Sequence, residues 1–327
     1  MVLYTELIAD SGPVLTDGGI ETRIMFGTGI EMDPEIQVAG LLGDPEGRSA
    51  LGEIYDGYIA AAAERQLPVV IGTPTFRASP NFVRRAGLQT SGVEGLNGLA
   101  VEFHLENRLR SGYEPVYIAG VIGPSGDAYR PEEALSPDAA ARYHRPQADA
   151  LSEAGADFLF AATFPSVDEA EGACVAMAAT GLPHVISWIL GPDSRVLDGS
   201  SLAGAIARLD SNPKARPLYH SLSCIHPTAG RRAVATLATE APDLLPRLVE
   251  FKANGSPLRT DELIRLKHPA ADPPETFADE MATLFDRQGL RVLGGCCGTD
   301  DSHLRALCRR LADLGADGPK AGTLDAI

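Results

Sequence analysis

Apolar runs of strand length alternate with helical patterns eight times along this chain of 327 residues. The predicted strands are 13–16, 67–72, 116–121, 157–161, 184–188, 217–223, 247–251 and 290–294. The predicted helices are 51–65, 93–110, 136–154, 166–180, 200–209, 231–237, 275–288 and 302–314. Eight consecutive strand–helix units with no break in composition predict an α/β fold of one (β/α)8 TIM barrel.

A single barrel accounts for the whole chain, 1–327, with 317–327 as a Gly- and Ala-rich tail that we expect to be loosely ordered. A doubly wound α/β sheet is the main alternative. It would place a G-x-G-x-x-G phosphate fingerprint after the first strand, and the segment there, 17–22, reads Asp-Gly-Gly-Ile-Glu-Thr instead. The sequence therefore favours the barrel.

The charge of the chain argues against several classes of partner. With 28 basic and 44 acidic residues the net charge is −16, which would repel phosphate backbones and anionic lipid. No apolar run approaches the ~18 residues that span a bilayer. The first residues, 1–7, lack the basic and apolar regions of a secretory signal. We therefore expect a cytoplasmic protein that binds neither nucleic acid nor membrane, and its oligomeric state is left open.

Two adjacent thiols, Cys296 and Cys297, follow the last predicted strand within the segment Gly-Gly-Cys-Cys-Gly-Thr, 294–299. A third thiol, Cys224, follows the sixth strand. In a (β/α)8 barrel the active site is built at the C-terminal ends of the strands, and strands six and eight are separated by only one strand. We therefore expect the three thiols to converge.

Three thiolates leave the fourth position of a tetrahedral metal open, as catalytic zinc sites do, and soft sulfur favours zinc over magnesium or calcium. The chain has no C-x2-C pair typical of a zinc finger. A thiol that joins such a zinc ion loses its proton. The predicted chemistry is attack by that sulfur on an electrophilic carbon. Metal-assisted hydrolysis is the weaker alternative, because an all-thiolate site makes the metal a poorer Lewis acid.

These motifs together resemble the homocysteine S-methyltransferases over about 14–307. The resemblance rests on 17–19, on Glu21 and Thr22, on Gly123-Pro124, on a lone Cys after strand six, on Asn254-Gly255 and on the final Gly-Gly-Cys-Cys-Gly-Thr. It implies a cytoplasmic methyltransferase of methionine biosynthesis. Such an enzyme moves a methyl group from S-methylmethionine, S-adenosylmethionine, betaine or a similar small donor to homocysteine or a related thiol.

The resemblance also implies roles for single residues. Cys224, Cys296 and Cys297 would be the ligands of Zn2+, and no further catalytic residue is implied. The candidate substrate-binding residues are Asp17, Gly18, Gly19, Glu21, Phe76, Arg77, Thr163 and Asn254.

The sequence departs from the family pattern at two informative positions. Relatives commonly read Glu-Thr-Ile-Pro where this chain reads Ala162-Thr163-Phe164-Pro165, so a carboxylate expected near the ammonium group of the substrate is absent. Relatives often carry Tyr where Arg77 stands, and a guanidinium attracts a carboxylate or phosphate. The hypothesis that follows is an altered donor, acceptor or both. A zinc-binding barrel that has lost catalysis and only binds a ligand is the alternative.

Several of these residues have structural explanations as well. Asp17 could cap a turn or helix, Glu21 could lie in a helix first turn, and Asn254 could form a left-handed turn before Gly255. Cys174 and Cys308 fall inside helical patterns and are expected to pack in the core.

Overall fold

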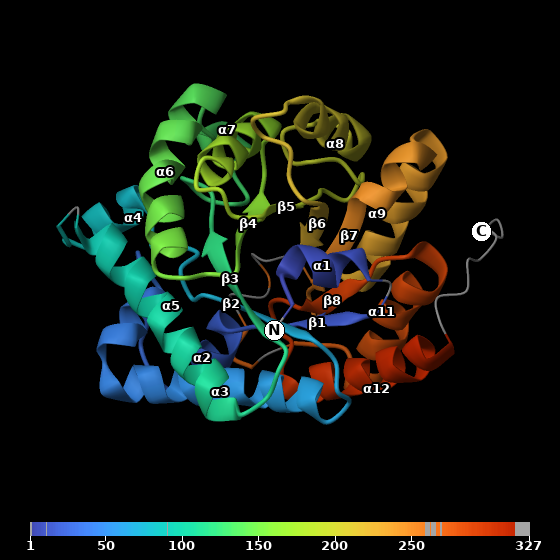
Figure 1. Cartoon of the computed structure of the whole chain (residues 1–327), viewed down its shortest axis with the longest axis horizontal. Helices are drawn as coiled ribbons and strands as arrows, with labels where there is room; N and C mark the ends of the chain where they lie inside the picture. The colour runs from blue at the N-terminus through green and yellow to red at the C-terminus, as the bar shows by residue number, and fades with distance from the viewer. Residues whose placement is uncertain are drawn as a thin grey trace.

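The computed structural model describes residues 2–10, 12–89, 91–258, 262, 266–268 and 270–317, so the predicted tail beyond Asp317 lies outside the described residues. Eight parallel strands form a closed barrel in chain order, β8 pairing back to β1 (Figure 1). The strands are β1 (Val14–Thr16), β2 (Val69–Gly72), β3 (Val116–Ile122), β4 (Phe158–Phe164), β5 (His184–Trp188), β6 (His220–Ser223), β7 (Leu248–Ala253) and β8 (Val292–Gly295). The predicted (β/α)8 fold is confirmed.

Helices surround the barrel and pack on its outer face. The main ones are α3 (Pro45–Ala63), α5 (Ser91–Ser111), α6 (Pro137–Glu153), α7 (Val167–Ala178), α8 (Leu202–Ser211), α9 (Pro227–Glu240), α11 (Pro274–Gln288) and α12 (Asp301–Asp317). Shorter ones are α1 (Tyr4–Ala9), α2 (Glu21–Gly27), α4 (Pro80–Arg85) and the 3-10 helices 38–43, 131–133 and 242–247. None of the helices that the structure describes is long and apolar enough to cross a membrane.

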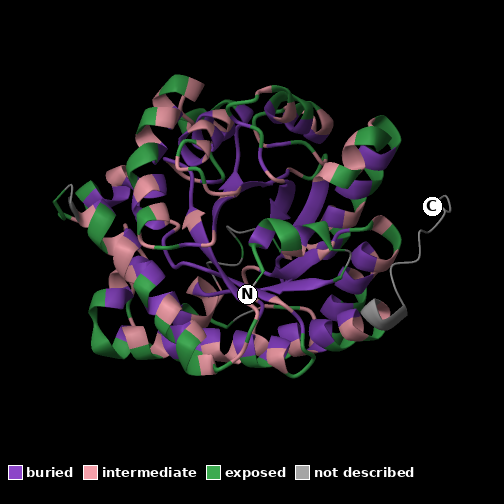
Figure 2. Cartoon of the chain, in the orientation of Figure 1, coloured by how far each residue is buried: buried purple, intermediate pink, exposed green. Residues whose placement is uncertain are grey.

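The core has two layers, one between strands and helices and one inside the barrel, and both are buried in Figure 2. Helix α1, which the sequence did not predict, covers the N-terminal ends of the strands. Tyr4 stacks on Phe158 at the start of β4 with ring centroids 3.9 Å apart, and its hydroxyl lies 2.5 Å from that of Tyr219. This end of the barrel is therefore closed by packed aromatic rings, and the opposite end is left for a site.

Inside the barrel, Glu250 on β7 is buried and accepts a hydrogen bond of 2.7 Å from the Tyr219 hydroxyl. Burial raises the pKa of this carboxyl from 4.5 to about 7, and the nearby ammonium of Lys252 opposes the shift. The folded chain thus holds this proton more tightly than the unfolded chain does.

This raised pKa predicts a pH-dependent stability. Between about pH 4.5 and pH 7 the folded state binds more protons than the unfolded state at this site, so the free energy of unfolding falls as the pH rises, by on the order of 3 kcal/mol. Chemical denaturation of Glu250→Gln should show a flatter dependence across this window. Glu240→Gln, at the exposed end of α9, is the control. Equal slopes for wild type and Glu250→Gln would contradict the assignment.

Candidate metal and substrate site

The three thiols singled out in the sequence meet at the C-terminal ends of the strands. Cys224 follows β6, and Cys296 and Cys297 follow β8. Their Sγ atoms all lie within 4.8 Å of one another, and those of Cys224 and Cys296 are 2.6 Å apart. All three side chains are partly exposed and line a cavity. A cluster of this size could hold one metal ion and leave one side of it open to the cavity.

The local backbone explains how adjacent cysteines reach one point. Cys224 has a φ of +57° and Gly298 a φ of +81°, so both chain segments turn through the left-handed region. A Cβ at position 295 would lie 2.0 Å from Thr299 Oγ1, so only glycine fits there. The Thr299 hydroxyl accepts from Gly19 N at 3.1 Å and donates to Cys296 O at 2.8 Å. The thiol loop is therefore tied to the turn after β1.

The thiols differ in acidity. Hydrogen bonds from the Cys224 and Cys297 sulfurs hold the pKa of Cys296 well below its usual range, and the ammonium of Lys252 contributes in the same direction. The hydrogen bond to Cys296 raises the pKa of Cys224. This soft, deprotonatable sulfur set fits a thiophilic cation such as zinc and does not fit magnesium or calcium.

The cavity beside the thiols has a volume of about 400 Å³. Most of the residues predicted to bind substrate line it: Asp17, Gly18, Gly19, Glu21, Phe76, Arg77 and Thr163. Asn254 is not in the lining. It is buried behind Cys224, where its Nδ2 donates to Cys224 O at 2.9 Å and its Oδ1 has no partner among the described residues. Its contact supports the backbone that presents one thiol.

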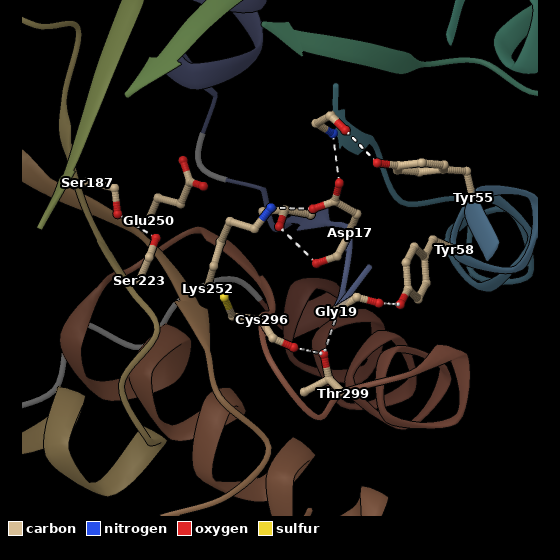
Figure 3. A network of polar contacts seen from close by, with 12 residues as sticks. Asp17, Gly19, Tyr55, Tyr58, Ser187, Ser223, Glu250, Lys252, Cys296 and Thr299 are labelled. Carbon is tan, nitrogen blue, oxygen red and sulfur yellow. Dashed lines mark hydrogen bonds and ion pairs between the residues drawn. The ribbon is translucent and has the colours of Figure 1, made fainter. Parts of the chain in front are cut away.

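Asp17 forms an ion pair that the sequence analysis missed. Its Oδ1 contacts Lys252 Nζ from β7, and its Oδ2 accepts from Gly72 N at 2.7 Å (Figure 3). Asp17 is 2% exposed and the Lys252 side chain 16%. Glu250 and Lys252 are two positions apart and therefore share one face of β7. The two-residue spacing of Glu250 and Lys252 was the signal in the sequence that both charges face the inside of the barrel.

Thr163 lies at an irregular point of β4. The pairing of β4 with β5 shifts register between Ala161 and Phe164, and Thr163 takes a φ of +56°. Its hydroxyl is buried and has no hydrogen-bond partner among the described residues. A β-branched residue at positive φ is strained, and such strain is held where the surrounding structure determines it. Thr163 and Ala162 at this bulge both line the cavity, and of these two side chains only that of Thr163 is polar.

Arg77 forms part of the cavity wall after β2. Its guanidinium lies over the Phe82 ring, 4.8 Å from the centroid. No hydrogen bond or ion pair reaches it from the part of the chain that the structure describes. Its donors are therefore free to bind an acceptor-rich molecule in the cavity.

The loop after β3 closes another part of the cavity with Asp127, Ala128 and Tyr129. Glu169 on α7, 1% exposed, anchors this loop. Its Oε1 accepts from Ser125 N at 2.7 Å and lies 3.1 Å from His144 Nε2. The sequence analysis missed this anchor, because nothing in the spacing of these residues links α7 to the loop.

Residues 14–311 match the family described as homocysteine S-methyltransferase. The Escherichia coli (strain K12) protein named homocysteine S-methyltransferase is 26% identical over 313 residues, covering 91% of this chain and 94% of that protein. Homocysteine S-methyltransferase 1 of Arabidopsis thaliana is 25% identical and covers 92% of this chain and 94% of that protein.

Solved structures agree on the fold. The metallated form of the homocysteine methyltransferase MmuM from Escherichia coli superposes with a TM-score of 0.74 at 22% identity, covering 93% of this chain and 98% of that one. The oxidized form of MmuM gives a TM-score of 0.75 at 24% identity, with 93% and 97% covered. Because the family match spans most of the barrel, the chain belongs to the homocysteine S-methyltransferase family of methyltransferase enzymes.

Proposed function

We propose that this chain transfers a methyl group from a small-molecule donor to the thiol of homocysteine or a related acceptor, with zinc held by Cys224, Cys296 and Cys297. The observation that carries the proposal is the convergence of three sulfur atoms, within 4.8 Å of one another, at the wall of a cavity of about 400 Å³. A single-domain enzyme of methionine biosynthesis in the cytoplasm is the corresponding cellular assignment.

Zinc bound there would supply a site at which an incoming thiol is deprotonated and stays nucleophilic. The protein supplies position. The Thr299 hydroxyl holds the thiol loop against Gly19, and Asn254 holds the Cys224 carbonyl. Phe76 and Phe160 form apolar parts of the cavity wall. Methyl transfer then requires a donor whose methyl carbon is aligned with that sulfur, since positioning supplies much of the rate.

The test is a matrix of donors and thiols with the zinc-loaded protein. The donors are S-methylmethionine, S-adenosylmethionine, betaine and a methyl-folate, and products are identified by mass spectrometry. Methionine or another methyl thioether from at least one pair is the expected result. Absence of any methylated thiol would favour a barrel that only binds its ligand.

Arg77 should bind the anionic group of a substrate, because its guanidinium donors are otherwise unused. Arg77→Ala should raise the KM of the carboxylate-bearing substrate by about tenfold to a hundredfold, the range of a charge-assisted hydrogen bond, with a smaller effect on kcat. Arg77→Lys should recover part of the loss, since Lys keeps the charge without the planar fork. Arg84→Ala, an exposed neighbour on α4, is the control. Unchanged affinity for homocysteine in Arg77→Ala would exclude this role.

A further inference from the structure

The carboxylates that line the cavity in the described chain are Asp17, Glu21 and Asp127. Asp17 has both oxygens engaged, one by the ammonium of Lys252 and the other by Gly72 N at 2.7 Å. Lys252 also lies 5.8 Å from the centroid of the Phe160 ring. An ammonium that belongs to the protein thus occupies the buried carboxylate on the β1 side of the cavity, as Figure 3 shows.

We propose that Lys252 determines which thiol the site accepts. Its ammonium pairs with the Asp17 carboxylate in the place that a substrate ammonium would take. The acceptor is therefore a thiol that carries an anionic group and needs no amino group. The inference rests on the proposed function, because it concerns the acceptor of that same site.

Exchange of the two ammonium groups would be unfavourable. If a substrate ammonium displaced Lys252 from Asp17, the Lys252 side chain would keep its charge in a largely buried position without that partner. Removing one partner of a buried pair is destabilising, and Lys252 would then depend on the nearby Glu250 and Cys296 in place of its direct contact with Asp17. A substrate that brings no ammonium to this point avoids the conflict.

The other two carboxylates, Glu21 and Asp127, are only partly buried, so water screens an ammonium beside them more than it would at Asp17. Asp127 already accepts from Tyr129 N at 2.9 Å. The Arg77 guanidinium and the Thr163 hydroxyl both line the cavity and have no hydrogen-bond partner among the described residues, and the guanidinium selects an anionic group. A free guanidinium, beside a buried carboxylate that Lys252 already pairs, therefore matches a mercapto acid better than an amino thiol.

The experiment compares three thiols on the zinc-loaded protein: homocysteine, its des-amino analogue and its descarboxy analogue. Binding is measured by calorimetry, and methyl transfer is measured separately with whichever donor is active. We expect the des-amino analogue to bind at least as tightly as homocysteine and the descarboxy analogue to bind markedly more weakly. Weaker binding of the des-amino analogue than of homocysteine would overturn the inference.

Variants distinguish a specificity role for Lys252 from a purely structural one. Lys252→Met leaves the Asp17 carboxylate free for a substrate ammonium. It should shift preference toward homocysteine over the des-amino analogue by about tenfold to a hundredfold, the range of a charge-assisted hydrogen bond. Added methylammonium should fill the same place and restore binding of the des-amino analogue. The double variant Asp17→Asn, Lys252→Met lacks both charges and should show neither effect.

Thermal unfolding checks that each variant is folded before its affinities are compared. A folded Lys252→Met with unchanged preference would contradict the inference. Calorimetry measures this preference even if no thiol is methylated. Absence of methyl transfer would overturn the proposed function and leave the binding result to decide the role of Lys252. The two failures are therefore distinguishable.

Discussion

Cys224→Ala is expected to lower the bound zinc from about one ion per chain to nearly none, because a site of three protein ligands loses one of them. Methyl transfer should fall by more than about a hundredfold, since loss of even a hydrogen-bond partner of a metal ligand costs about 10–100-fold. The physical reason is geometric: the Cys296 and Cys297 sulfurs come from one loop, and the Cys224 sulfur, which follows β6, completes the cluster proposed to hold the metal. Elemental analysis and the product assay measure the two effects.

Cys308→Ala is the matched control. Cys308 is a free cysteine as well, but it is buried in α12, and burial raises its pKa to about 12, so it stays a thiol. This variant should keep its zinc and its turnover. Equal loss of zinc in both variants would point to unfolding, and full zinc retention in Cys224→Ala would contradict the site.

Glu169→Ala should reduce the free energy of unfolding by about 1–3 kcal/mol for each buried donor that loses its acceptor. The substitution leaves Ser125 N and His144 Nε2 without their acceptor. It should also loosen the loop that carries Asp127 and Tyr129 into the cavity and so raise the KM for substrate. Denaturant titration and steady-state kinetics measure both effects.

The neighbouring variant Asp168→Ala provides the comparison, because Asp168 pairs with Arg208 at the surface with its side chain 56% exposed. An exposed pair contributes about 0–1 kcal/mol.

The stabilisation that Glu169 provides should also depend on pH. Although burial opposes ionisation, the contact with His144 and the Ser125 hydrogen bond lower the pKa of this carboxyl below 4.5. Its stabilisation is therefore present above about pH 4.5 and is lost as the pH falls through the folded-state pKa. Similar losses of stability in Glu169→Ala and Asp168→Ala would contradict the anchoring role.

The barrel was predictable because its signal is local and repeated. Each strand is a short apolar run with a helical pattern after it, and eight such units are compatible with only a few arrangements of strands and helices. The convergence of Cys224 with Cys296 and Cys297 followed from the same rule, since strand ends meet at one face. Even so, some boundaries differ: the helix expected at 231–237 extends over Pro227–Glu240, where Pro227 starts the helix and His226 caps it.

What the sequence did not reveal depends on long-range placement. The Asp17–Lys252 pair joins positions 235 residues apart, and a lysine in a strand is usually read as a solvated charge. The anchoring of the loop after β3 by Glu169 requires the packing of α7 beside α6. The left-handed conformation of Thr163 follows from a register shift between β4 and β5, which no single strand sequence encodes.

X-ray absorption spectroscopy at the zinc edge tests the central claim most directly, because it counts the sulfur atoms around the metal before and after the acceptor thiol is added. The account predicts three sulfur neighbours and one lighter atom in the zinc-loaded protein, and four sulfur neighbours once the thiol is present. A coordination shell that keeps three sulfur atoms in the presence of a saturating acceptor thiol, or one that never contains three, would contradict it.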